Sequence, residues 1–322
     1  MLIAFSGTTP RTVSAESADC RGALQSAVWV DLFNPSPEEI RAVESTFGIQ
    51  LPTRGEAHEI EVSSRLYVED RTVFMTATVM VGADTPHPET SPVTFAYQPQ
   101  RLVTLRFAEP KPLATFRRKL ERTPAAFPTA QKILVGLADE IVDRLADILE
   151  SVGSDLNLVS HIVFHDRRRR SAVDYTAVLT RIGHTGERAA NARESLVTIG
   201  RLLAFFAEVQ SNLGREPLDE HWATVGKDVS ALTDHATFLS NKVNFFLDAT
   251  LGRINIDQNM IIKLFSVLAV IFLPPTLVAS IYGMNFAHMP ELGWLLGYPF
   301  SLVVMLLAAV APYMLFKRKG WL

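Results

Sequence analysis

The pattern of apolar and polar positions divides the chain into a mixed first part, a helical middle and a strongly apolar end. Up to about residue 128, short β-like runs alternate with helical stretches. Beyond that point strand signals vanish and apolar residues recur at helical spacing. From Leu264 to Phe316 there is no Lys, Arg or Asp. We therefore expect an α/β domain over residues 1–128, a helical hairpin and stalk over 129–262, and an apolar domain over 263–322.

Local signals predict several elements of the first part. "AVWVDL" (Ala27–Leu32) is typical of a buried strand. In the helix that follows, Ser36 is expected as the N-cap, Pro37 as the first helical residue and Glu39 as the partner that completes a capping box. The turn-like "EDR" and "QPQ" each lie between β-rich runs and predict hairpins.

Three long helices are expected in the middle of the chain. They cover Thr129–His165, about residues 172–213, and a stretch that begins near Leu218. Nothing stops the third helix before the apolar end, because its first proline is Pro274. The 46 residues from Leu218 to Lys263 would span ~69 Å at ~1.5 Å per residue. We call this predicted helix the stalk, and expect it to continue into the apolar domain.

Two apolar segments follow, Leu264–Tyr282 with 19 residues and Gly297–Phe316 with 20. A bilayer core ~30 Å thick is crossed by roughly 20 apolar residues in a helix, so both segments predict membrane spans. The alternative is a pair of buried helices in a soluble protein, but such helices usually keep a polar edge. Glu291 is the one formal charge between Leu264 and Phe316.

The distribution of charge predicts the orientation in the membrane. Arg253 and Lys263 precede the first span, Lys317, Arg318 and Lys319 follow the second, and the loop between the spans has no Lys or Arg. The positive-inside rule then places both termini in the cytoplasm. "MLIAFSGTTPR" has no basic segment typical of a secretory signal. A multi-pass protein of the cell's inner membrane is expected.

The remaining composition excludes few functions. The chain has 31 basic and 34 acidic residues, and without residues 264–322 the net charge is −5, which does not favour nucleic-acid binding. Cys20 is the single cysteine, so neither a disulfide nor a thiolate metal site is expected. "VGKD" lacks both the first glycine and the hydroxyl residue of a phosphate-binding loop. The scattered histidines have no zinc-ligand spacing. Neither an enzyme nor an organic cofactor is predicted.

Arg167–Arg170 form the one dense basic run, between the first two long helices. If the second helix packs antiparallel on the stalk, this run returns close to the membrane, where it would contact anionic lipids. A solvated hairpin turn is the plainer interpretation, and the sequence leaves the role of the run open.

One face of the first span is small or polar. Steps of three and four residues keep to one side of a helix. Such steps select Asn259, Ile262, Ser266, Ala269, Leu273, Thr276, Ser280 and Gly283. We call this set the small-polar stripe. A stripe of this kind is typical of close helix–helix packing and also of the lining of a water-filled pore, and the pattern alone does not separate the two.

The motifs around the end of the first span resemble those of the CorA-type magnesium/cobalt transporter family. "FLPPTLVASIYGMN" leads into the Gly-Met-Asn signature at Gly283, Met284 and Asn285. "MPEL" follows at Met289, Pro290, Glu291 and Leu292, then "GYP" and a basic C-terminus. The close match covers about residues 242–322, and the upstream part matches in architecture.

The resemblance implies a funnel-shaped homopentamer in the lipid bilayer, in which five first spans line one pore.

 The family's pore-facing positions fall on Asn259, Ile262, Leu273, Thr276, Ser280, Gly283 and Asn285. Because most of them belong to the small-polar stripe, the resemblance favours the pore, so Ser266 and Ala269 are also expected to line it. Phe265 matches a constriction of the family and lies beside the stripe. The family's basic collar at the cytoplasmic mouth corresponds to Lys263, Lys317, Arg318 and Lys319.

The Gly-Met-Asn signature suits a hydrated ion. Mg²⁺ gives up its water shell reluctantly, and a ring of Asn285 carboxamide oxygens can accept hydrogen bonds from that shell without stripping it. A helix C-cap is the plainer role for an asparagine at this place. Family loops often carry an acid shortly after the signature, but here Ala287 and His288 leave Glu291 as the loop's one acid.

The expected function is passive entry of divalent cations, with Mg²⁺ as substrate and Co²⁺ and Ni²⁺ as further passengers. The family senses cytoplasmic Mg²⁺ at acids between subunits, so Mg²⁺ is also the expected regulatory ligand. The acids that would bind it cannot be paired from the sequence. The candidates are Asp70, Asp84, Glu89, Asp219, Glu220, Asp228, Asp234, Asp248 and Asp257. The alternatives are a zinc transporter of the same family, which the intact signature disfavours, and a non-conducting membrane-anchored sensor or scaffold.

Overall fold

A computed structural model describes residues 1–6, 9–14, 20–165, 174–213, 218, 220–285 and 289–320, with the backbone alone at 9–11, 165, 291 and 292. The chain forms two compact units, Met1–Asp248 and Ala249–Leu322, which we call unit 1 and unit 2. Arg167–Arg170 and Asp219 lie outside the described residues. The three-part division expected at residues 128 and 262 remains a proposal.

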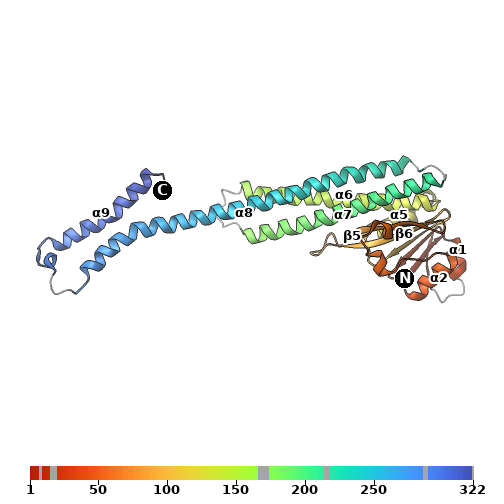
Figure 1. Ribbon diagram of the computed structural model, residues 1–322, viewed down its shortest axis with the longest axis horizontal. Helices are drawn as coiled ribbons and strands as arrows, with labels where there is room; N and C mark the ends of the chain where they lie inside the picture. The colour runs from red at the N-terminus through yellow and green to blue at the C-terminus, as the bar shows by residue number, and fades with distance from the viewer. Residues whose placement is uncertain are drawn as a thin grey trace. The chain divides into compact units, whose positions relative to one another are not determined.

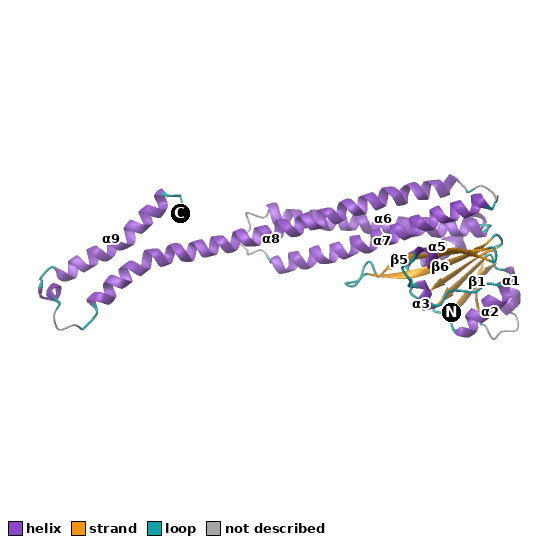
Figure 2. Cartoon of the chain, viewed as in Figure 1, coloured by secondary structure: helices purple, strands orange, loops and turns teal. Residues whose placement is uncertain are grey.

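A seven-stranded sheet is the centre of unit 1, in the order β2-β1-β3-β7-β6-β5-β4 (Figure 2). The strands are β1 (Leu2–Ser6), β2 (Thr9–Val13), β3 (Trp29–Phe33), β4 (Leu66–Glu69), β5 (Thr72–Val81), β6 (Glu89–Gln98) and β7 (Arg101–Arg106). β3 and β7 are parallel, and the other neighbouring strands are antiparallel.

The hairpins expected from the sequence are confirmed. β4 turns into β5 through Asp70 and Arg71, both with positive φ, and β6 pairs with β7 from the closing pair Gln98–Arg101 outward. The sheet also contains β1 and β2, which the sequence analysis did not predict. The short apolar run Leu2–Phe5 becomes a strand because it is buried between β2 and β3.

Short helices lie along the sheet. They are α1 (Cys20–Ser26), α2 (Pro37–Phe47), α3 (Arg54–Ala57) and α4 (Val62–Arg65). Of these, α1 and α2 cover one face of the sheet. The predicted capping box is confirmed, since Ser36 accepts from the backbone N–H of Glu39 and the Glu39 carboxylate accepts from the backbone N–H of Ser36. Leu24, Val30 and Val43 belong to the apolar core between α1, α2 and the sheet.

Longer helices cover the other face (Figure 1). They are α5 (Lys111–Arg122), α6 (Ala130–Ser160) and α7 (Tyr175–Asn212), with a short 3-10 turn η1 (Pro124–Ala126) before α6 and a π-helical turn η2 (His161–His165) after it. α7 packs on β5 and β6. Its Thr198 hydroxyl accepts from the backbone N–H of Thr78 at 3.0 Å and donates to the carbonyl of the same residue at 3.2 Å. The Thr198 side chain therefore supplies hydrogen-bond partners to the backbone of β5 at Thr78, past Met75, where the pairing of β5 with β4 stops.

The helix expected as the stalk is α8 (Glu220–Tyr282), which is continuous through 63 residues and contains Pro274 and Pro275. In unit 1 it packs closely on α7. A Cβ at Gly200 would lie 3.1 Å from Val229, and a Cβ at Gly186 would lie 3.1 Å from Val243. The two glycines let α8 approach α7, and the ring centroids of Phe206 and Trp222 are 5.0 Å apart. Unit 2 contains the rest of α8, a 3-10 turn η3 (Pro290–Gly293) and α9 (Gly297–Arg318).

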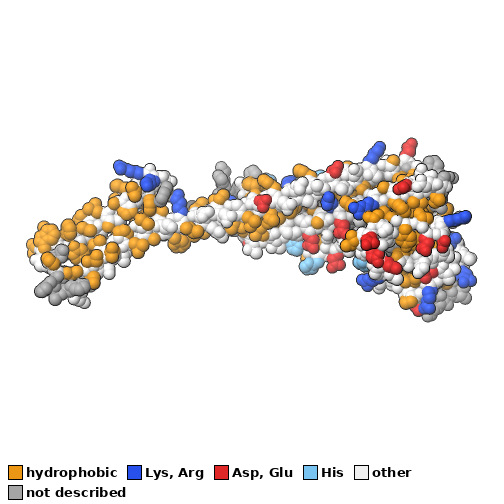
Figure 3. All heavy atoms as spheres, viewed as in Figure 1, with side chains coloured by type: hydrophobic (Ala, Val, Ile, Leu, Met, Phe, Trp, Pro, Cys, Tyr) orange, Lys and Arg blue, Asp and Glu red, His pale blue; other side chains and the backbone are white. Residues whose placement is uncertain are grey.

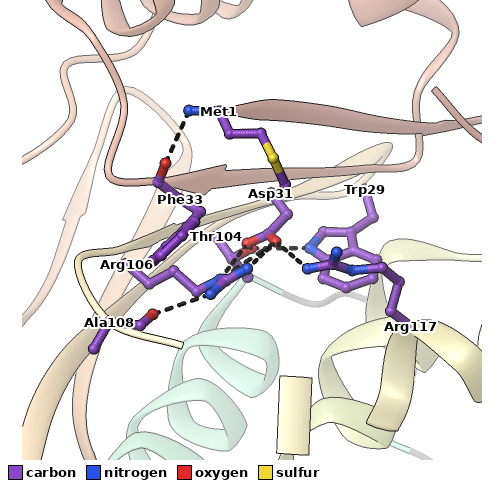
Figure 4. A network of polar contacts seen from close by, with 8 residues as sticks. All are labelled: Met1, Trp29, Asp31, Phe33, Thr104, Arg106, Ala108 and Arg117. Atoms are coloured by element: carbon purple, nitrogen blue, oxygen red, sulfur yellow. Dashed lines mark hydrogen bonds and ion pairs between the residues drawn. The ribbon is translucent and has the colours of Figure 1, made fainter. Parts of the chain in front are cut away.

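A charged cluster lies between the parallel strands β3 and β7 and helix α5 (Figure 4). The Asp31 carboxylate is fully buried and accepts from Nη2 of Arg106 at 2.9 Å and from the Thr104 hydroxyl at 2.8 Å. Arg117 of α5 approaches the same carboxylate at 3.3 Å. Trp29 donates its indole N–H to Thr104 at 3.1 Å. Because Asp31 alternates with apolar Val30 and Leu32, it faces the helices α5–α7 while its neighbours face α1 and α2.

Candidate functional site

Unit 2 consists almost entirely of apolar surface. Among the described residues, α8 and α9 are the two helices long and apolar enough to cross a membrane, and only 6% of the most apolar window of each is buried. Figure 3 shows hydrophobic side chains over both helices. Leu264, Leu277 and Leu306 are each about three-fifths exposed. Such surface is stable only in apolar surroundings or against another protein surface.

Within unit 2, one face of α8 is less exposed to solvent than the rest of the helix. The less exposed positions are Val267, Ile271, Pro274, Pro275, Val278 and Tyr282, which repeat at helical spacing. Val267 is 8% exposed, while its neighbours Ser266 and Leu268 are exposed. α9 is the other long helix of this unit, and its own buried positions, Gly297 and Ser301, are small residues four apart. Small residues of this kind usually serve close packing between membrane helices, so we infer that the less exposed face of α8 is the one toward α9.

The small-polar stripe lies on the opposite face of α8. At ~3.6 residues per turn the stripe is about 180° from the positions that α9 covers. Every stripe residue is exposed in the chain, with Ile262 at 61% and Leu273 at 64%. Phe265 is 66% exposed and lies at the edge of the stripe. The stripe is therefore not the contact between α8 and α9 of one chain, which removes the simplest form of the packing interpretation.

Two hydroxyl groups on the stripe present acceptor oxygens. Ser266 donates its proton to the carbonyl of Ile262 at 2.8 Å, and Thr276 donates to the carbonyl of Phe272 at 2.7 Å. A hydroxyl that has donated its proton retains two lone pairs. Pro274 and Pro275 lack backbone N–H groups, so the carbonyls one turn before them lose their helical donors. These carbonyls belong to Val270 and Ile271, which are not stripe residues. The acceptors on the stripe itself are therefore the hydroxyl oxygens of Ser266 and Thr276, which suit the water shell of a cation.

The helix ends at the signature residues. Gly283 donates to the carbonyl of Ala279 at 2.9 Å, and Met284 to that of Ile281 at 3.2 Å. A Cβ at Gly283 would lie 3.1 Å from the Ala279 carbonyl oxygen, so glycine serves here for close approach and not for a positive φ. Asn285 is exposed, its φ is not positive, and its carboxamide has no hydrogen-bond partner within the described part of the chain. The left-handed C-cap expected as the plainer role is therefore absent at Asn285.

The remaining predicted residues flank the two helices. Met289 is half-buried and Pro290 is exposed at the start of η3, while Glu291 and Leu292 are described by their backbone alone. Lys317 and Arg318 close the last turn of α9, Lys319 is its C-cap, and all three are exposed, as is Lys263. Figure 3 shows basic side chains gathered at the C-terminal end of α9.

The candidate regulatory acids do not form a ready metal site. Across the described residues, no group of three or more His, Cys, Asp or Glu is arranged to hold a metal ion. Asp84 is engaged with Lys111, and its other contact is Arg144 at 2.8 Å. The hydrogen bond from Lys111, followed by that from Arg144, holds the pKa of Asp84 below its usual value. Two features were missed from the sequence: the buried pair Asp31–Arg106, signalled only by an acid inside an apolar strand, and the arginine-lined groove described below.

Fold and surface together define a two-span membrane protein with a large α/β and helical domain before the spans. Comparisons with known proteins agree. Residues 25–318 match the family model described as CorA-like Mg²⁺ transporter protein. The magnesium transport protein CorA of Escherichia coli K12 is 35% identical over 322 residues, which is 100% of both chains. The chain therefore belongs to the CorA-like Mg²⁺ transporter family, as the Gly-Met-Asn signature predicted.

Solved structures share the fold. The complete CorA magnesium transporter of Methanocaldococcus jannaschii gives a TM-score of 0.67 at 19% identity, covering 100% of this chain and 99% of that one. The cytoplasmic domain of ZntB from Vibrio parahaemolyticus gives 0.54 at 12% identity, covering 80% and 97%. The predicted fold class, an α/β domain followed by long helices and two apolar C-terminal helices, is confirmed.

Proposed function

We propose that this protein is a passive channel for divalent cations, with Mg²⁺ as its main substrate and Co²⁺ and Ni²⁺ as further passengers. The observation that carries the proposal is the small-polar stripe of α8. It is exposed on the face opposite α9 and ends at the unpartnered carboxamide of Asn285. The curated relative of the same length is a magnesium transport protein.

The polar stripe favours an assembly of identical chains. Its hydroxyl and carboxamide groups are poorly suited to lipid, where unsatisfied polar groups are costly. The chain's own second span lies on the other side of α8 and cannot cover them. A ring of identical chains brings the stripes together around a wet axis and leaves the apolar faces and α9 toward lipid. The family resemblance sets the expected number of chains at five.

Asn285 is proposed as the outer selectivity element. A ring of neutral carboxamides accepts hydrogen bonds from the waters around Mg²⁺, so the ion need not be dehydrated. Thr276 and Ser266 continue the row of acceptors inward. Phe265, Ile262 and Leu273 are proposed as the apolar constrictions of the same pathway. The lysines and Arg318 of the basic collar lie at the cytoplasmic end, where the positive-inside rule places both termini.

Transport in this scheme needs no chemical energy source. An inside-negative potential favours entry by ~2.3 kcal/mol per charge per 100 mV, hence ~4.6 kcal/mol for a dication. Cytoplasmic Mg²⁺ is proposed to regulate the channel by bridging carboxylates of neighbouring chains. Because Asp84 is already paired with two cations of its own chain, the exposed acids of α8, such as Asp228 and Asp234, are better candidates for that role.

The test is Mg²⁺ entry into liposomes that contain the wild type or Asn285→Ala at matched oligomer levels. The alanine variant removes every carboxamide of the ring, so entry is expected to fall to background while assembly stays normal. Asn244→Ala, at an exposed asparagine of α8 in unit 1, is the matched control and should conduct like the wild type. Cobalt hexaammine, a rigid mimic of a hydrated ion, should block the wild type.

Other results would change the assignment. Wild-type rates in Asn285→Ala would remove Asn285 from the mechanism and leave Thr276 and the rest of the stripe as the filter. No divalent entry in the wild type would favour the non-conducting sensor or scaffold. Entry of Zn²⁺ in preference to Mg²⁺ would place the protein with the zinc transporters of the family.

A further inference from the structure

A groove of about 430 Å³ opens in unit 1 where α4, α7 and α8 meet. Arg65 at the end of α4 lines it together with Arg193 and Arg201 of α7 and Ser240 of α8. Glu194 is the one acidic residue among the lining residues, so arginines outnumber carboxylates by three to one. Like charges in one groove repel each other, and a bound anion would neutralise the excess positive charge of the lining arginines.

Two of the three guanidinium groups are held by hydrogen bonds, and all three keep N–H donors for a further partner. Arg65 donates from Nη1 to the Thr78 hydroxyl at 3.0 Å, and Arg193 from Nε to the Thr237 hydroxyl at 3.1 Å. Arg201 is exposed and makes no hydrogen bond or ion pair with any other described residue. A guanidinium has five N–H donors. None of the three arginines has a carboxylate partner within the part of the chain that the structure describes, so most of these donors remain for a ligand.

The groove also has an apolar side. Ile60 is 87% exposed, an unusual exposure for an isoleucine, and lines the groove together with Val197 and Ala190. Guanidinium groups bind phosphate oxygens in a bidentate manner, and an apolar wall suits the flat face of a base. The volume lies within the range of about 300–1,000 Å³ that is usual for small-molecule sites.

We propose that this groove binds a nucleoside polyphosphate, with the phosphates on Arg65, Arg193 and Arg201 and the base against Ile60. The ligand would contact the end of α4, α7 and α8 at once, so it would tie the α/β layer to the helix that continues into the first span. The site rests on contacts within unit 1 and does not depend on the proposed transport function.

The experiment is equilibrium binding of ATP to the full-length protein in detergent, measured by calorimetry with and without Mg²⁺. Saturable binding is expected for the wild type. Arg201→Gln should weaken it about tenfold, and Arg193→Gln/Arg201→Gln by about a hundredfold, because each change removes charge-assisted hydrogen bonds to phosphate. Arg41→Gln is the matched control, since it removes the same charge from an exposed arginine of α2. It should bind ATP like the wild type.

Further probes decide the chemistry of the ligand. Adenosine should bind far more weakly than ATP, and inorganic tripolyphosphate should lie between them. Equal binding of tripolyphosphate and ATP would overturn the role of Ile60 and the nucleoside. No saturable ATP binding by the wild type, or equal binding by the double variant, would overturn the site. Loss of assembly in Arg201→Gln without any ATP binding would instead assign the groove to a contact with a second copy of the chain.

Discussion

Replacing Asp31 by asparagine tests whether the buried charged cluster holds β3 and β7 together. The carboxylate is fully buried and the Arg106 side chain is 1% exposed. Asparagine keeps the shape but removes the charge, and it places an amide donor near Nη2 of Arg106, which now lies 2.9 Å from a carboxylate oxygen. Arg106 would then be a buried cation whose remaining partners are all neutral: the one side-chain oxygen kept at position 31, the carbonyl of Ala108 and the ring of Phe33.

The expected cost follows from that burial. Removing one partner of a buried ion pair typically destabilises a protein by about 3–5 kcal/mol. For a domain of this size each kcal/mol lowers Tm by about 2–4 °C, so Asp31→Asn should lower the Tm of unit 1 by roughly 6–20 °C. Trp29 reports the change directly, because its indole donates to Thr104, a hydrogen-bond donor to Asp31.

The assay is thermal unfolding of the full-length protein in detergent, followed by tryptophan fluorescence at a single heating rate, since such unfolding is often rate-dependent. Arg106→Gln and the double variant Asp31→Asn/Arg106→Gln complete a double-mutant cycle. If the cost comes from an uncompensated buried charge, the double variant should lose much less than the sum of the singles. Stability losses of the two single variants that simply add in the double variant would refute the reasoning. A Tm of Asp31→Asn within 2 °C of the wild type would also refute it, because the expected decrease in Tm is at least about 6 °C.

Two further predictions concern the helices of unit 1. Gly136→Ala would place a Cβ against the rings of Phe116 and Phe127, so we expect a loss of stability of about 1–3 kcal/mol. Gly183→Ala has open space around its Cβ and should stabilise α7 by about 0.5–1 kcal/mol. Urea unfolding of both variants checks this, and equal effects of the two substitutions would contradict it. Burial, followed by the nearby charges of Asp139 and Glu140, raises the pKa of Asp143 above 3.8. The folded state then binds the proton more tightly than the unfolded state, and stability falls as pH rises from about 3.8 through the raised pKa. Asp143→Asn should therefore stabilise the protein at pH 7 by about 0.4–1 kcal/mol, as expected from its two like-charge neighbours one turn away. Below pH 3.8 the substitution should give no gain in stability. An equal gain in stability at low pH would show that charge is not the cause.

The sequence by itself was sufficient for features whose cause is local. Ser36, Pro37 and Glu39 form a capping box because the groups that bond are three residues apart. The turns at Asp70–Arg71 and Pro99–Gln100 follow from turn chemistry between β-rich runs. The long helices follow from periodicity, and the two spans from the absence of charge over a length that matches a bilayer. The Gly-Met-Asn signature is a contiguous motif, so the family too was readable from the sequence.

Only the tertiary structure decided features that join distant segments. Asp31 meets Arg106, 75 residues away, because β3 and β7 pair in parallel and in one register. β5 pairs with β6 to merge the two predicted hairpins into one sheet. The groove collects Arg65, Arg193 and Ser240 from three elements. The small-polar stripe was visible in the sequence, but its position opposite α9 was not, because periodicity marks which residues share a face and leaves open what covers that face. Local patterns arise from bonds between near neighbours, whereas these pairings depend on which of many apolar faces pack together when the whole chain folds.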